Sequence, residues 1–200
     1  MTEIEKLLTM TYEECINYFL KKYGNVPENY FYIKQNNTLG SKNNKITRGN
    51  EGLYIHHIDE DKAILLSTPE FAKKNPIYYQ KADRLIYCNL LEHLVLHIKI
   101  IEYPNPKQNK NEICGVGGIY KFIVPELNDI YSGITYKQPW KQKVVEIILP
   151  LKQDYLRCIK HLVKINFPYP LLNSFNKYFG WNEKNNKKIY SELIKNGVKK

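Results

Sequence analysis

The segments YIHHI at residues 54–58 and YCNLLEHLVLH at residues 87–97 carry the most specific pattern in this sequence. The first predicts a short strand over residues 53–58, closed by the acidic turn at residues 59–61. The second begins in a β segment over residues 84–88, and Asn89 is placed to cap a helix whose apolar residues continue to Ile101, before Pro104. Together they predict a strand, a second strand and a helix.

All but one of the five histidines fall in these two segments. His93 and His97 are four residues apart on the predicted helix, so both imidazoles project from one face and can share one metal ion. Taken alone, such a pair is equally compatible with a solvated or core position. His56 and His57 are neighbours on a strand and point to opposite faces, so they can serve one site only where the strand ends or bends. The acidic turn supplies that ending.

The rest of the sequence predicts a mixture of helices, short strands and polar loops. Thr11 and Glu14 have the spacing of a capping box, which predicts a helix ended by Gly24. We further expect a basic loop or arm at 34–50, a short strand at 63–66, a short helix or turn at 68–74, a polar linker at 105–111, a tight loop between strands at 115–118, a buried strand at 144–151, a helix at 150–165 and a basic amphipathic helix at 183–195.

Length and composition predict an α+β protein built around the strand–strand–helix unit. The 200 residues suit one core with additions: a helical segment and basic loop at 1–50, the unit itself at 51–104, and a mixed strand and helix segment at 105–200 that is a candidate for DNA contact. The four cysteines are scattered without a C-x-x-C pair, which excludes a cysteine zinc ribbon and favours a reduced, cytoplasmic protein. We expect no signal peptide and no membrane span, because no apolar stretch is long enough.

The charge balance points to a polyanionic partner. Thirty Lys and Arg against twenty Asp and Glu give a net charge of +10, as expected of proteins that bind nucleic acid. Lys, Asn, Ile and Tyr all have AT-rich codons, so genome composition is an alternative source of part of the excess. Double-stranded DNA is the expected partner, with RNA left open, and the sequence does not choose between a monomer and a homodimer.

The two segments resemble the HNH endonucleases of the ββα-metal, or His-Me finger, superfamily, and most closely the His-rich finger of the colicin-type DNases. The resemblance covers residues 52–101 and implies a β-hairpin and helix around one divalent ion. It assigns His56, His93 and His97 as metal ligands. It also assigns His57 as the general base and Asn89 as the residue that steadies the base loop. Two departures concern specificity: the cysteine knuckles of many relatives are absent, and thirty-one residues separate His57 from Asn89.

The function that follows is hydrolysis of DNA phosphodiester bonds. His57 would activate water, and a metal held by three imidazoles would stabilise the phosphate and the leaving oxygen. Such a site favours zinc, nickel, cobalt or manganese over magnesium. Four nearby cations are candidate phosphate contacts, with solvated surface charges as the alternative for each: Arg48, Lys62, Lys81 and Arg84.

Two other classes compete with the nuclease. In a non-catalytic nucleic-acid-binding protein, zinc would only stabilise the fold, and neither Asn89 nor the second histidine of the doublet would be needed. A metalloprotease requires His-Glu-x-x-His, whereas Glu92 precedes the histidine pair. The biological role, as a restriction-type, mobile-element, phage or toxin nuclease, is left open.

Overall fold

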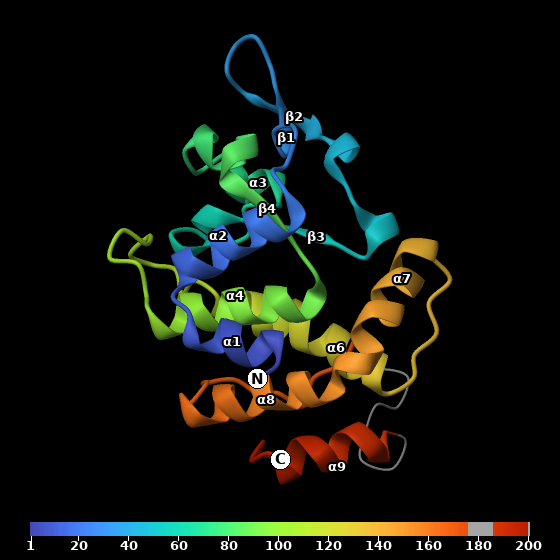
Figure 1. Cartoon of the computed structure of the whole chain (residues 1–200). Helices are drawn as coiled ribbons and strands as arrows, with labels where there is room; N and C mark the ends of the chain where they lie inside the picture. The colour runs from blue at the N-terminus through green and yellow to red at the C-terminus, as the bar shows by residue number, and fades with distance from the viewer. Residues whose placement is uncertain (176–185, 200) are drawn as a thin grey trace.

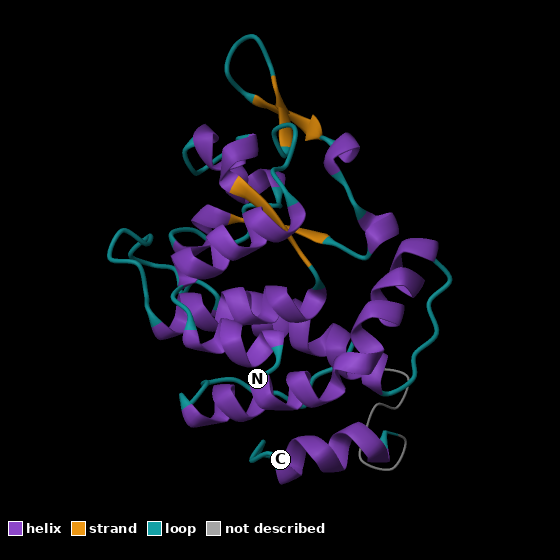
Figure 2. Cartoon of the chain, in the orientation of Figure 1, coloured by secondary structure: helices purple, strands orange, loops and turns teal. Residues whose placement is uncertain are grey.

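A computed structural model describes residues 1–175 and 186–199. It confirms the α+β class, with helices predominating (Figures 1 and 2). The strands are β1 (Phe31–Ile33), β2 (Leu39–Lys42), β3 (Tyr54–His57) and β4 (Leu85–Cys88). The helices are α1 (Glu3–Thr9), α2 (Tyr12–Tyr23), α3 (Pro69–Ala72), α4 (Leu90–Glu102), α5 (Val116–Gly118), α6 (Val124–Tyr131), α7 (Pro139–Ile148), α8 (Lys152–Lys164) and α9 (Lys187–Lys195).

The strands form two separate antiparallel pairs, β1 with β2 and β3 with β4. In the second pair His56 lies opposite Ile86, and His57 lies opposite Leu85. The predicted strands at 53–58 and 84–88 are therefore confirmed, and they pair with each other although the connection between them is long. Short 3₁₀ helices occupy much of that connection, beginning with η3 (Ile58–Asp61) directly after His57.

Helix α4 lies at the centre of the molecule. Its apolar residues face all sides, and nearly all of them are buried, as expected of a helix surrounded by others. In Figure 1, α2 lies above it and α1 and α8 lie below, and all three contact it. Asn89 is the N-cap, as predicted, and Glu92 completes a capping box.

One hydrophobic core joins helices from both ends of the chain to α4. It runs from Ile4 in α1 through α4 to Leu193 in α9, so the three sequence ranges share it. A second, smaller core lies beneath the β1–β2 hairpin and includes Phe31, Ile46 and Leu85. Since β4 contributes Leu85 to one core and Ile86 to the other, the β3–β4 pair sits between them.

Three strand predictions are wrong. Residues 144–151 form the end of α7 and a 3₁₀ turn, because Val144 and Ile148 are spaced by one helical turn and both are buried. Residues 63–66 are not a strand. The loop expected at 115–118 instead begins a continuous helical stretch through α5, the π-helix Ile119–Ile123 and α6. The described residues beyond 105 contain helices and no strand (Figure 2).

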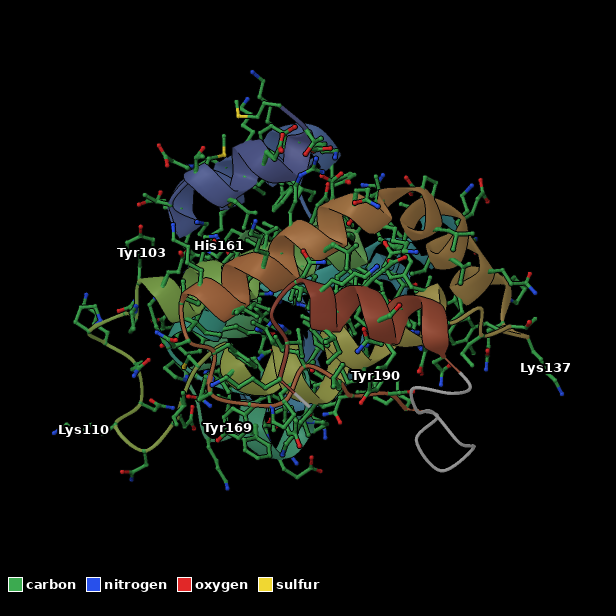
Figure 3. The ribbon with its side chains drawn as sticks, turned by 90° about the horizontal axis from the view of Figure 1, so that it is seen from below. Tyr103, Lys110, Lys137, His161, Tyr169 and Tyr190 are labelled. Carbon is green, nitrogen blue, oxygen red and sulfur yellow. The ribbon has the colours of Figure 1, made fainter. Side chains whose placement is uncertain are left out.

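The basic arm at 34–50 is also more ordered than predicted, since it contains β2 and two 3₁₀ turns. The helix at 11–23 and that at 150–165 are confirmed as α2 and α8. The final helix is confirmed over Lys187–Lys195, while the first residues of its predicted range lie outside the described residues. Figure 3 shows α9 beside α8, and its Ile189 and Leu193 are buried in the core, so this helix docks on the protein.

Among the residues described, no helix combines the length and the apolarity needed to cross a lipid bilayer. All four cysteines are buried free thiols.

Candidate metal centre

Four side chains converge between β3 and α4. They are His56 from β3, Glu60 from η3, and His93 and His97 from α4, and their ligand atoms all lie within 4.8 Å of one another. His97 Nε2 lies 3.2 Å from His93 Nε2 and 3.2 Å from a Glu60 oxygen, and that oxygen is 3.5 Å from His56 Nδ1. Three imidazoles and one carboxylate are ligands that transition metals accept, so this cluster could hold a metal ion.

The local backbone explains the convergence. Strand β3 ends at His57, and η3 turns the chain immediately, which brings Glu60 back over the two histidines three and four residues before it. His93 and His97 are one turn apart on α4, so their rings project to the same side. The sequence predicted the three histidine ligands together, and the structure places them together.

Hydrogen bonds set which ring nitrogen of His56 and of His97 faces the cluster. The single hydroxyl hydrogen of Tyr12 is donated to the carbonyl of Ile58 at 2.9 Å, so this hydroxyl accepts Nε2–H of His56 at 2.8 Å. Nδ1 of His56 then carries a lone pair, and this buried atom has no hydrogen-bond partner among the described residues. The carbonyl of Gly115 can only accept, so His97 donates Nδ1–H to it at 2.9 Å and presents the lone pair of Nε2.

His57 is held in the same manner, on the other side of Glu60. The Gln80 amide donates to the carbonyl of Leu66 at 3.1 Å, so its oxygen faces His57 and accepts Nε2–H at 3.0 Å. Nδ1 of His57 is buried without a hydrogen-bond partner among the described residues, 3.6 Å from the second Glu60 oxygen. The Tyr30 ring packs on this imidazole, with 4.5 Å between centroids.

Burial keeps two of the histidines, His56 and His93, in their metal-binding form. Burial lowers the pKa of His56 to about 3 and holds the pKa of His93 well below its usual range. Neutral imidazoles at His56 and His93 are in the protonation state that a divalent cation requires.

The sequence analysis did not predict Glu60 as a ligand, although Glu60 lies in the acidic turn at residues 59–61. Asp59 accepts hydrogen bonds from Arg84 and Lys62, and Asp61 accepts one from Asn105, so neither carboxylate joins the cluster. Glu60 follows His56 by four residues and His57 by three, and one helical turn brings residues at these spacings together. This spacing is the signal that could have identified Glu60.

Gly118 is a second residue without a sequence signal. A Cβ built on it would lie 2.2 Å from Cε1 of His97, so only glycine leaves room for this ring. Gly115 has no side chain, but its backbone carbonyl accepts a hydrogen bond from His97 and so orients the same ring. The tight 115–118 segment therefore shapes the metal cluster.

Asn89 lies at the start of α4 and caps it. Its side-chain oxygen accepts the backbone N–H groups of Leu91 and Glu92, each at 2.9 Å. Glu92 is fully buried and accepts hydrogen bonds from Asn89, Lys22 and Tyr23, which tie α2 to α4. The residue that hydrogen-bonds to His57 is Gln80, so Asn89 acts on the site by fixing the helix that carries His93 and His97.

Three of the four candidate phosphate contacts are paired within the protein. Arg48 binds Glu51 and donates to the carbonyl of Tyr23, while Arg84 and Lys62 both bind Asp59. Their guanidinium and ammonium groups stabilise the connections around β3 and β4. Lys81 is exposed.

The cluster opens to solvent through two clefts. One, of about 560 Å³, extends past Tyr54 to Trp140, and the other, of about 420 Å³, extends to Phe122. Glu60, Ser67 and His93 line both. A bound molecule could thus approach the cluster from either side of His93.

Comparison with known proteins identified no relative. A scan against protein-family models found no match, and searches of curated proteins and of solved structures found none either.

Proposed function

We propose that this protein is a metal-dependent endonuclease that hydrolyses DNA phosphodiester bonds, with β3, β4 and α4 acting as a ββα-metal finger. The observation that carries the proposal is the unpaired Nδ1 of His57, which lies beside a cluster of three histidines and a carboxylate. A structural metal site needs the cluster, but it does not need a second oriented imidazole with a free lone pair.

His56, Glu60, His93 and His97 would hold the divalent ion. Their donor atoms fit such an ion because the lone pairs of His56 Nδ1 and His97 Nε2 converge on one carboxylate. When bound, the ion would neutralise negative charge on the scissile phosphate and on the departing oxygen.

His57 would take a proton from the attacking water at Nδ1. Gln80 orients the ring for this step, since its oxygen holds Nε2–H. As the imidazole gains positive charge, the Gln80 oxygen and the Glu60 carboxylate, 3.6 Å from Nδ1, stabilise it. Tyr30 restricts rotation of the ring by packing against it.

The net charge of +10 supports a nucleic acid substrate, and the two clefts support cleavage within a strand. A polynucleotide that lies across His93 can continue on both sides of the cluster.

The test is incubation of the purified protein with supercoiled plasmid and a series of divalent ions. We expect cleavage by the parent, a loss of about 100-fold or more in His57→Ala with metal content retained, and a loss of bound metal in His93→Ala. Tyr103→Ala is the control, because Tyr103 is 64% exposed and lines neither cleft. Undiminished cleavage by His57→Ala would show that the base is misassigned.

A zinc-stabilised nucleic-acid-binding protein is the second candidate. Four protein ligands fill a tetrahedral zinc site, and closed sites of this kind are structural. In that case the plasmid would stay intact with every ion, and removing the metal would unfold the protein. Glu60→Gln separates the two: a structural site would lose stability, whereas a catalytic site would keep its fold.

A further inference from the structure

The larger cleft connects the metal cluster with an exposed tryptophan. Glu60 and His93 line one end of it, and Tyr54, Trp140 and Lys42 line the rest. The ring centroids of His93 and Tyr54 are 6.2 Å apart, and those of Tyr54 and Trp140 are 6.1 Å apart. A molecule in this cleft can therefore contact the cluster and the indole together.

Trp140 is held in place although 39% of its surface is exposed. It occupies the first turn of α7, where the 3₁₀ helix η2 (Gly49–Glu51) packs against it, and a Cβ on Gly49 would lie 3.2 Å from that of Trp140. Gly52, at φ +68°, approaches Ile147 on the same helix so closely that a Cβ would lie 2.6 Å from Ile147 Cδ1. The two glycines thus bring the arm and α7 together to form the cleft.

Positive charges accompany the aromatic rings. The ammonium of Lys141 lies 4.5 Å from the Trp140 ring centroid, and it binds Glu126. Lys42 on β2 is exposed, with its ammonium 4.8 Å from the Tyr30 centroid. Aromatic faces alternating with cations are typical of surfaces that bind single-stranded nucleic acid, where bases stack and phosphates pair.

We propose that Trp140 is a nucleobase subsite: a base near the scissile phosphate stacks on the indole, while Lys42 contacts the neighbouring backbone. This inference rests on the proposed nuclease function and specifies its substrate. Both faces of a base inside a duplex are covered by its neighbours, so only an unpaired base can stack on Trp140. The preferred substrate is therefore single-stranded, or locally opened, next to the cleavage site.

The test uses tryptophan fluorescence. The chain has two tryptophans, and Trp181→Phe leaves Trp140 as the single reporter. This variant is combined with His57→Ala, which keeps the metal ligands, and is titrated with a mixed-sequence single-stranded DNA, the same strand as RNA, and a blunt DNA duplex. A gel run after each titration shows whether the strand is intact. We expect quenching by a single strand and weaker quenching by the duplex.

Affinity is measured in parallel by the anisotropy of a labelled single strand. Trp140→Ala should raise Kd about 5- to 150-fold, as expected for loss of one base–aromatic stack, and Trp140→Phe should restore part of the affinity. Tyr103→Ala is the matched control, since Tyr103 is 64% exposed, does not line this cleft and lies at the margin of the face seen in Figure 3. Its Kd should equal that of the parent.

The inference fails if no single strand quenches Trp140, if Trp140→Ala binds as tightly as the parent, or if the duplex quenches as strongly as the single strand. Quenching by only one of the two single strands, DNA or RNA, supports the inference and shows which sugar the substrate carries. Binding is read without cleavage, so quenching by a protein that cuts no plasmid would retain the subsite and reject the nuclease. If Trp140→Ala cleaved DNA as fast as the parent, the nuclease function would be retained and the subsite would be rejected.

Discussion

At the scale of single residues, the site depends on groups that hydrogen-bond to the far side of three imidazoles, those of His56, His57 and His97. Tyr12, Gly115 and Gln80 each bind the ring nitrogen that faces away from the cluster or the base position. Because a neutral imidazole has one N–H, fixing it on one nitrogen places the lone pair on the other. These three contacts convert a group of histidines into oriented ligands and an oriented base.

Gly118→Ala tests how tightly His97 is confined. The added Cβ would lie 2.2 Å from Cε1 of the ring, so His97 must move away from the cluster. We expect divalent-ion affinity to fall about 10- to 100-fold, measured by competition with a chromogenic chelator. Gly117→Ala is the control, because a Cβ there meets no atom within 4 Å. Equal affinities in the two variants would contradict the assignment of His97 as a ligand.

Gln80→Met tests the orientation of His57. Methionine has a similar length but no acceptor for Nε2–H, so the ring loses the bond that selects its tautomer. We expect kcat to fall about 10-fold or more with KM and metal content unchanged. Gln80→Glu keeps an acceptor and should recover part of kcat. A parallel fall of kcat and metal content in both variants would indicate a purely structural role.

The histidines could be predicted from the sequence, whereas their partners could not. The doublet, Asn89 and the i, i+4 pair form a local pattern, and local spacing fixes which way a side chain points. Tyr12 is 44 residues from His56, and Gln80 is 23 residues from His57, so only the tertiary fold brings them together. Glu60 was within reach of local reasoning, but three adjacent acidic residues offered no way to choose among them without the turn geometry.

At the scale of elements, buried ion pairs fix α4 against its neighbours. Lys99 is almost fully buried, donates to the last turn of α1 at the carbonyl of Leu8, and binds Glu102 at 2.7 Å. The other oxygen of Glu102 lies 2.6 Å from His161 on α8. The Glu102 carboxylate thus links α4 to α8, and the Lys99 ammonium that it binds links α4 to α1. Together they fix the position of the helix that presents His93 and His97.

Glu102→Gln should destabilise the protein by about 2–4 kcal/mol, because Lys99 would keep a buried charge without its counter-ion. Urea unfolding at pH 7 measures the effect. Glu146→Gln is the control, since Glu146 pairs with Lys143 on the exposed side of α7 and such pairs contribute little. Similar losses in the two variants would show that burial does not strengthen the Glu102 contacts.

The same carboxylate predicts a pH dependence. Burial acts to raise the pKa of Glu102, but Lys99 and His161 outweigh it and lower this pKa below its ordinary value. The unfolded state then binds the proton more readily, so the contribution is complete above pH ~4.3 and is lost as the pH falls through the folded-state pKa. The difference in unfolding free energy between parent and Glu102→Gln should shrink below pH ~4.3, and a constant difference down to pH 3 would contradict this linkage.

Errors at the element scale have a common cause. Residues 144–151 are rich in Val and Ile, which favour strands, yet Pro139 at the first position of a helix and the burial of Val144 and Ile148 select α7. The glycines at 115–118 suggest a turn, but Gly118 lies in a helical stretch and is required by its close contact with His97. In both cases packing against distant residues overrides local propensity.

At the scale of the whole molecule, the basic side chains differ in whether they are free to contact a polyanion. Arg48, Lys62 and Arg84 are bound to carboxylates of the protein and stabilise the loops around the cluster. Lys42 and Lys45 are exposed, and they lie on β2 and the 3₁₀ turn that follows it, at the upper end of the molecule in Figure 1. The net charge alone therefore does not show which face meets a polyanion. The observation that favours the hairpin face is that Lys42 lines the larger cleft.

The salt dependence of binding tests which face is used. If the hairpin face contacts the substrate, Lys42→Gln with Lys45→Gln should reduce the slope of log Kd against log salt by about 1.4 for a single strand, since each released phosphate contact contributes about 0.7. Lys160→Gln with Lys164→Gln is the matched control, because both residues are exposed on α8, which crosses the face seen in Figure 3, and the net charge changes equally. Steering by total charge alone would weaken both double variants equally, since the long-range field depends on net charge. A reduced slope only in the α8 variant would place the nucleic acid on α8, whose residues line neither cleft, and would separate binding from the metal cluster.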